Sequence, residues 1–135
     1  MLMLTKVFVY GTLCQGQRYH HIIAPFAKHT QKATVRGTLY DLPVGYPAMI
    51  EGDNPVKGEL VELQNVPEAL RLLDELEDYE PNRDTNEYER IVVKAVTERG
   101  DEVECYLYLY APNRREWLAE HGTLVPGGDW PSFKG

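Results

Sequence analysis

Val7-Phe8-Val9-Tyr10-Gly11-Thr12-Leu13 joins a short run of β-branched and aromatic residues to a glycine. Such a run predicts a buried strand over 7–10, and the two glycines of the following segment predict a loop over 11–17. A glycine at the end of a strand lets the backbone turn sharply, so that consecutive amide N–H groups can converge on an anion. The pattern is compatible with an anion-binding loop, and an ordinary structural turn is the alternative.

The rest of the chain shows more strand patterns than helical ones. Strands are expected at 32–42, 48–50, 56–63, 88–97 and 102–110, helices at 18–27 and 66–78, and turns at 43–47, 52–55 and 98–101. Segment 79–86 predicts a loop, and the tail from 111 is rich in proline and glycine. In the last strand Val103, Cys105, Leu107 and Leu109 share one face, while Glu104, Tyr106, Tyr108 and Tyr110 share the other. We therefore expect one α+β domain over residues 1–135, with a strongly curved sheet that is either open or closed into a barrel.

Composition excludes several classes of function. A net charge of −7 without a basic cluster argues against a nucleic acid or an anionic membrane surface as partner. No apolar run approaches the roughly 20 residues that span a bilayer, and the apolar start, 1–4, is too short for a signal peptide. Cys14 and Cys105 lack zinc-site spacing and are expected to be reduced thiols. These features together predict a cytoplasmic protein.

The helix expected at 66–78, with Asn65 as its N-cap, carries one acidic residue in an unusual place. At 100° per residue its apolar stripe contains Val66, Ala69, Leu70, Leu73 and Leu76. Glu77 falls inside that stripe, whereas Asp74 and Glu75 project sideways or away. A carboxylate that faces the core has a raised pKa and suits general base catalysis at neutral pH. Two alternatives remain: Glu77 reaches solvent beyond the last full turn, or it pairs with a cation such as Arg90.

Several short motifs, taken in order, resemble the γ-glutamylcyclotransferase-like family, and most of all its γ-glutamylamine cyclotransferase and AIG2-like branch. They are Val7-Phe8-Val9-Tyr10-Gly11-Thr12-Leu13, Gly16-Gln17 with His20, Gly37-Thr38-Leu39-Tyr40-Asp41-Leu42, Gly45-Tyr46-Pro47-Ala48, Val56-Lys57-Gly58-Glu59-Leu60, Leu73-Asp74-Glu75-Leu76-Glu77, Tyr88-Glu89-Arg90 and Cys105-Tyr106-Leu107-Tyr108. No single motif is specific, but their order and spacing over residues 5–115 are.

The resemblance implies a small mixed barrel with flanking helices and a central cavity. It also implies an enzyme that cyclises a γ-glutamyl amide to 5-oxoproline and releases the free amine, with no metal or cofactor and with a small molecule as its partner. The implied site residues are Glu77 as the catalytic carboxylate, the backbone amides of Tyr10, Gly11, Thr12 and Leu13 for the glutamyl group, Tyr108 as a hydrogen-bonding residue, and Tyr88 in the cavity wall.

The chain departs from the family in places, and other functions stay open. Asp78 stands where the family often has glycine, and Cys14 and Gln15 stand where basic residues are frequent. A non-catalytic binding module on the same fold is the main alternative. Weaker ones are a cysteine nucleophile, Cys14 with His20 or His21, and a metal site built from His20, His21, His29 and His121. The leaving amine and the oligomeric state are not fixed by the sequence.

Overall fold

The computed structural model describes residues 4–135, so most of the apolar start at 1–4 lies outside the described residues. The described part contains six strands, four α-helices and two short 3-10 helices. In chain order they are β1 (Lys6–Val9), α1 (His20–Ile23), η1 (Ala24–Phe26), β2 (Ala27–Asp41), β3 (Pro47–Leu63), α2 (Val66–Leu76), β4 (Tyr88–Thr97), β5 (Glu102–Tyr110), η2 (Pro112–Arg114), α3 (Arg115–His121), β6 (Thr123–Leu124) and α4 (Trp130–Lys134).

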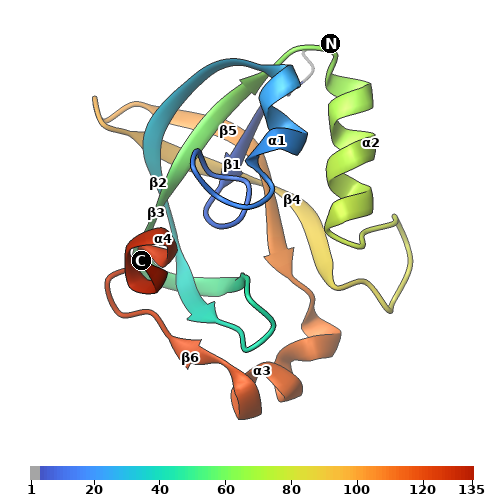
Figure 1. Ribbon diagram of the computed structural model, residues 1–135, viewed down its shortest axis with the longest axis vertical. Coiled ribbons are helices and arrows are strands. Elements are labelled where there is room, and N and C mark those ends of the chain that lie inside the picture. The colour runs from blue at the N-terminus through green and yellow to red at the C-terminus, as the bar shows by residue number, and fades with distance from the viewer. Residues whose placement is uncertain (1–3) are drawn as a thin grey trace.

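Five of the strands close into a mixed barrel. Neighbouring strands follow the order β3-β1-β5-β4-β2, and a further pairing of β2 with β3 closes the ring, while β6 adds to the end of β2. Within residues 4–135 β1 and β5 are the parallel neighbours, and the other pairs are antiparallel. The four helices lie around the outside (Figure 1). The predicted fold class, a mixed barrel with flanking helices, is confirmed.

The barrel interior is filled by one face of each strand. Its buried core includes Phe8, Leu39, Met49, Val56, Leu60, Ala95, Cys105, Leu107 and Leu109. The alternation predicted for 102–110 is therefore correct, because Cys105, Leu107 and Leu109 point inward and Tyr106, Tyr108 and Tyr110 belong to the cluster on the other face. Because side chains fill the barrel interior, a cavity can form only beside it, at the outer face of β1 and β5.

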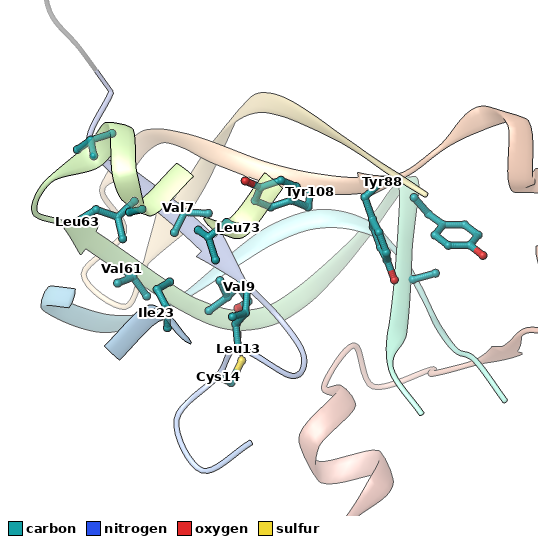
Figure 2. Close-up of a cluster of buried hydrophobic side chains, with 14 of the residues drawn as sticks. Val7, Val9, Leu13, Cys14, Ile23, Val61, Leu63, Leu73, Tyr88 and Tyr108 are labelled. Atoms are coloured by element: carbon teal, nitrogen blue, oxygen red, sulfur yellow. Dashed lines mark hydrogen bonds between the residues drawn. The ribbon is translucent and has the colours of Figure 1, made fainter. Parts of the chain in front are cut away.

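A second buried cluster fills the space between the barrel and the first two helices. Ile23 of α1 and Leu73 of α2 pack toward Val7, Val9 and Val61 on the outer face of the barrel (Figure 2). Each of these five side chains is no more than 3% exposed, which is the burial expected for an amphipathic helix docked on a sheet. This packing fixes the position of α2, and with it the end of the helix that carries Glu77.

Some local predictions were wrong. The turn expected at 52–55 does not end a strand, because β3 continues through it and forms a bulge where Gly37 pairs with Asn54 and Thr38 pairs with Ile50. The helix expected at 18–27 is only one α-helical turn followed by a 3-10 turn that contains Pro25. Asn65 has a left-handed backbone, with φ of 50°, and its side chain makes no capping hydrogen bond.

The tail from 111, for which the sequence predicted no helix or strand, contains α3, β6 and α4. Trp130 of α4 is buried in the barrel core, and its indole N–H donates to Asp41 Oδ1 at 2.8 Å. The tail therefore covers one end of the barrel. No helix among residues 4–135 is both long enough and apolar enough to cross a membrane. That residues 1–135 form one domain stays a prediction.

Candidate active site

A cavity of about 170 Å³ lies where the loop after β1 meets the C-terminal end of α2. Its wall contains every residue for which the sequence predicted a role: Tyr10, Gly11, Thr12, Leu13, Glu77, Tyr88 and Tyr108. It also contains residues that the sequence analysis did not assign to the site, among them Tyr19, Tyr46, Pro47 and Glu87. The structure thus brings five separate segments of the chain together around one cavity.

Glu77 is the residue at which α2 stops. The helix was expected to reach 78, but it ends at Leu76, and Glu77 is its C-cap with φ of −86° and ψ of 1°. The N–H of Asp78 donates to the Glu75 carbonyl oxygen at 3.3 Å, and the N–H of Tyr79 donates to the Asp74 carbonyl oxygen at 2.9 Å. These two bonds make a Schellman motif, a common way to end a helix. The motif fixes the backbone from which the Glu77 side chain enters the cavity.

The environment of Glu77 favours its protonated form. Burial, with a smaller contribution from the negative charge of Glu87, raises its pKa from 4.5 to about 8. No donor or cation among residues 4–135 acts to lower it. A carboxyl group whose pKa lies near neutrality can both accept and return a proton under physiological conditions. Glu77 is partly buried and lines the cavity, so the interpretation in which it simply reaches solvent is not supported by the geometry.

The alternative pairing of Glu77 with Arg90 is also not found. Arg90 instead places its guanidinium 3.1 Å from Asp74 Oδ2, and it stacks over the rings of Tyr79 and Tyr106. Asp74, which was expected to project sideways or away, is partly buried and accepts a hydrogen bond of 2.6 Å from the Tyr108 hydroxyl. Asp74 therefore forms the ion pair with Arg90. Glu77 has no cationic partner in the described part of the chain.

The loop after β1 offers backbone donors to the cavity. The N–H groups of Gly11, Thr12 and Leu13 donate to no other backbone group within residues 4–135, whereas the Gly11 and Thr12 carbonyl oxygens accept from Cys14 and Tyr19. The reason for a glycine at 11 differs from the expected sharp turn. A Cβ atom there would lie 2.7 Å from Cδ of Pro47 and would overlap Cγ, so only glycine allows the proline ring to pack against the loop.

The three tyrosines of the predicted site hold the cavity wall together through their hydroxyl groups. Tyr10 donates to the Tyr108 carbonyl oxygen at 2.7 Å, Tyr88 donates to the Pro47 carbonyl oxygen at 2.6 Å, and Tyr108 donates to Asp74. Burial raises the pKa of all three phenols, so they remain neutral. Because the hydroxyl protons already have acceptors, Tyr88 and Tyr108 face a ligand mainly with their rings.

Sequence reasoning missed a second carboxylate in this cavity. Glu87 lies just before β4, and its Oε2 accepts a hydrogen bond from the Tyr46 hydroxyl. Burial, followed by this hydrogen bond and the charge of Glu87, raises the pKa of Tyr46. Tyr46 and Glu87 are 41 positions apart in sequence, so no local pattern joins them. The motif Gly45-Tyr46-Pro47-Ala48 within the family resemblance was the available signal for Tyr46.

The cysteine and metal alternatives receive no support from the geometry. The Cys14 thiol is buried and lies 3.6 Å from the Val9 carbonyl oxygen, and burial raises its pKa, so it is a poor nucleophile. His20 directs Nδ1 at the Leu13 carbonyl oxygen, at 3.0 Å, and not at a thiol. Both cysteines are free. In the part of the chain that the structure describes, no three His, Cys, Asp or Glu side chains gather as they would around a metal ion.

Comparison with known proteins agrees with this arrangement of motifs. Residues 7–132 match the family described as Gamma-glutamyl cyclotransferase, AIG2-like. The chain belongs to that family. Membership implies a cyclotransferase enzyme, and the γ-glutamylcyclotransferase family includes proteins of bacteria and of animals.

Three relatives illustrate the range of the γ-glutamylcyclotransferase family. A protein of Halalkalibacterium halodurans that carries a gamma-glutamylcyclotransferase name is 43% identical over 104 residues, which are 76% of this chain and 85% of the relative. The Gamma-glutamylaminecyclotransferase of Mus musculus is 29% identical over 133 residues, covering 85% and 84% of the two chains. The crystal structure of an AIG2-like protein from Mus musculus superposes with a TM-score of 0.67 at 25% identity, covering 87% of this chain and 84% of the other.

The geometry explains one departure from the γ-glutamylcyclotransferase pattern. Asp78 occupies the C′ position of the Schellman motif and has φ of 56°, a left-handed conformation that glycine adopts without strain. Asp and Asn are the residues that tolerate this conformation best after glycine. The guanidinium of Arg83 donates to both the carbonyl oxygen and Oδ1 of Asp78, at 2.7 Å each. An aspartate can therefore replace the glycine without moving Glu77.

Proposed function

We propose that this protein converts a γ-glutamyl amide, such as a γ-glutamyl amine or γ-glutamyl amino acid, to 5-oxoproline and releases the free amine. The observation that carries the proposal is that Glu77 lines the same cavity as Gly11, Thr12 and Leu13, whose N–H groups donate to no backbone group within residues 4–135. Family membership supports the reaction class, and the relative named Gamma-glutamylaminecyclotransferase supports an amine as leaving group.

In this proposal the loop after β1 binds the α-carboxylate of the substrate. Backbone N–H groups that lack other partners are good donors to an anion. Held there, the glutamyl chain can fold back so that its α-nitrogen approaches its own γ-carbonyl carbon. Because both reacting groups belong to one molecule, orientation alone can contribute several kcal/mol. The rings of Tyr88 and Tyr108 limit the space in which the chain can fold.

Glu77 then carries protons between the two nitrogen atoms. As carboxylate it takes a proton from the α-ammonium group, and the amine attacks the γ-carbonyl carbon to form the lactam C–N bond. The second α-nitrogen proton also passes to the leaving nitrogen through Glu77, the original amide C–N bond breaks, and the amine departs as an ammonium ion. Because its pKa is raised to about 8, the Glu77 carboxylate is a stronger base than an ordinary glutamate and accepts a proton from the α-ammonium group more readily.

A panel of substrates tests the proposed function. Purified protein is incubated with γ-glutamyl amines and γ-glutamyl amino acids, and 5-oxoproline release is measured. We expect release from at least one class. Binding of 5-oxoproline without turnover of any γ-glutamyl compound would instead favour the non-catalytic module. The absence of nucleic acid, membrane, metal and cofactor from its action, and its place in the cytoplasm, stay predictions.

A further inference from the structure

The wall of the active-site cavity has an unbalanced charge. Among the described residues it contains two acidic side chains, Glu77 and Glu87, and no lysine, arginine or histidine. The two carboxylates interact electrostatically, because the negative charge of Glu87 is one cause of the raised Glu77 pKa. Only one of the two is needed to move protons. The second therefore requires an explanation of its own.

Glu87 is built into the cavity by the loop that separates it from Glu77. The loop closes on itself where the Glu87 N–H donates to the Asp78 carbonyl oxygen at 3.1 Å. Asn86, which is fully buried, holds the inside of the loop: its Oδ1 accepts from the Glu80 N–H at 3.0 Å and from Arg83 Nε at 2.6 Å. Its amide nitrogen donates to the Glu80 carbonyl oxygen at 2.9 Å and to Glu89 at 2.7 Å. A side chain bonded in this way fixes the start of β4.

The carboxylate of Glu87 is oriented but not neutralised. One oxygen accepts the Tyr46 hydroxyl, and no ion pair to Glu87 forms within residues 4–135. Two cations lie near the surrounding tyrosines: Arg114 acts on Tyr46 and Tyr110, and Arg18 stands 5.4 Å from the centroid of the Tyr19 ring. Neither lines the cavity. The charge of Glu87 therefore remains available to a ligand.

We infer that Glu87 is a specificity-determining residue, which selects γ-glutamyl substrates whose leaving amine carries a second positive charge. The inference rests on the proposed function and adds the chemical class of the leaving group. With the α-carboxylate at the loop after β1 and both nitrogens within reach of Glu77, the leaving group is the part of the substrate that remains for the second acid. A diamine or a lysine-like amine would place an ammonium group beside Glu87, whereas an anionic leaving group would meet two carboxylates.

Three substrates of equal length separate the effect of charge from that of shape. They are γ-glutamyl amides of 1,5-diaminopentane, of n-hexylamine and of 6-aminohexanoate, which end in an ammonium group, a methyl group and a carboxylate. For the wild-type protein we expect kcat/KM to fall in that order, with at least a tenfold preference for the ammonium over the methyl substrate. Tenfold corresponds to about 1.4 kcal/mol of selective binding.

Variants at Glu87 then assign the preference to this residue. In Glu87→Gln, whose amide can still accept from Tyr46, the preference for the ammonium over the methyl substrate should fall below threefold. Any effect of the lost charge on the Glu77 pKa acts on all three substrates alike and leaves this ratio unchanged. Glu87→Lys should favour the carboxylate substrate. Glu80→Gln is the matched control, because Glu80 is exposed and outside the cavity wall, and it should keep the wild-type order.

Each outcome either supports or overturns the inference. Equal wild-type turnover of all three substrates would overturn it without any variant, even if Glu87→Gln failed to fold. A wild-type preference retained in Glu87→Gln, with or without an equal loss for all three substrates, would also overturn it, because the preference would then not come from Glu87. If no γ-glutamyl compound releases 5-oxoproline, the proposed function itself fails, which is a different result from turnover without charge preference.

Discussion

Glu77 combines a partly buried position with a need to change its charge. Its folded-state pKa of about 8 exceeds the ordinary value of 4.5, so the folded protein holds the Glu77 proton more tightly than the unfolded chain does. The stability that this group contributes is complete at pH values below 4.5 and is lost as the pH rises to about 8. At neutral pH the protein therefore keeps an acid in a place where a neutral residue would be more stable, which is typical of a functional group.

Replacement of Glu77 by glutamine should stabilise the protein in a pH-dependent manner. A glutamine has a similar shape and no proton to lose, so the variant avoids the burial of a charge. We expect its free energy of unfolding to match the wild type near pH 4.5 and to exceed it increasingly toward pH 8. The gain is at most about 1.4 kcal/mol per pH unit. Urea unfolding of both proteins at about pH 5 and about pH 8 measures it, and an equal difference at both pH values would contradict a buried, titrating Glu77.

Among the elements, the loop after β1 depends on a close contact with the start of β3. Gly11→Ala would place a methyl group against the ring of Pro47, where the new Cβ atom would lie 2.7 Å from Cδ. Either the loop or the proline must move, at a cost of about 1–3 kcal/mol. Because the loop carries the free N–H groups, we also expect kcat/KM for γ-glutamyl substrates to fall at least about tenfold, as for the loss of preorganised donors.

Gly127→Ala is the control for that substitution. A Cβ atom at Gly127 meets nothing within 4 Å, and its backbone is not in the left-handed region, so the variant should resemble the wild type. Thermal unfolding and steady-state kinetics of the two variants are compared. If Gly11→Ala were as stable and as active as Gly127→Ala, the contact with Pro47 would not position the loop.

For the whole molecule, the closure of the barrel is uneven. β2 and β3 pair continuously along most of their length, apart from the bulge, and β4 and β5 pair from Tyr88 to Val96. The seam between β2 and β4 consists of only two pairs, Ala33 with Thr97 and Thr34 with Val96. Local opening starts where few backbone hydrogen bonds must break together.

Hydrogen exchange should therefore show two levels of protection in the barrel. Amides within the β2–β3 and β4–β5 ladders are expected to exchange only on global unfolding. Any amide of Ala33, Thr34 or Val96 that donates across the seam should exchange through a smaller opening with weaker dependence on denaturant. Native-state exchange measured by NMR distinguishes the two groups. Equal protection at the seam and in the ladders would contradict this view of the barrel.

Local sequence patterns predicted the structural features that interactions between neighbouring residues determine. The alternation along 102–110 identified the inward side chains Cys105, Leu107 and Leu109, because successive residues of a strand point to opposite faces. The helical wheel singled out Glu77 because α2 packs its stripe on the barrel. The motif after the first strand marked the loop, although the reason for Gly11 is the Pro47 ring and not the sharp turn that was expected.

Features that depend on contacts between distant segments could not be predicted. β3 passes through Gly52 and Pro55 because its pairing with β2 supplies hydrogen bonds on both sides of a bulge, and this outweighs the turn preference of those residues. The contact of Glu87 with Tyr46 exists only once β3 and β4 have taken their places. The Asp78 conformation likewise follows from the helix end and not from its own preference.

The central claim is that Glu77 carries the protons in the cyclisation of a γ-glutamyl amide. The most direct test is single-turnover release of 5-oxoproline by the wild type and by Glu77→Gln, with binding of 5-oxoproline measured on both. We predict that the variant binds 5-oxoproline with the same affinity as the wild type. Its single-turnover formation of 5-oxoproline from a γ-glutamyl substrate should be about 10²–10⁴-fold slower. Release at the wild-type rate by a folded Glu77→Gln variant would contradict the claim.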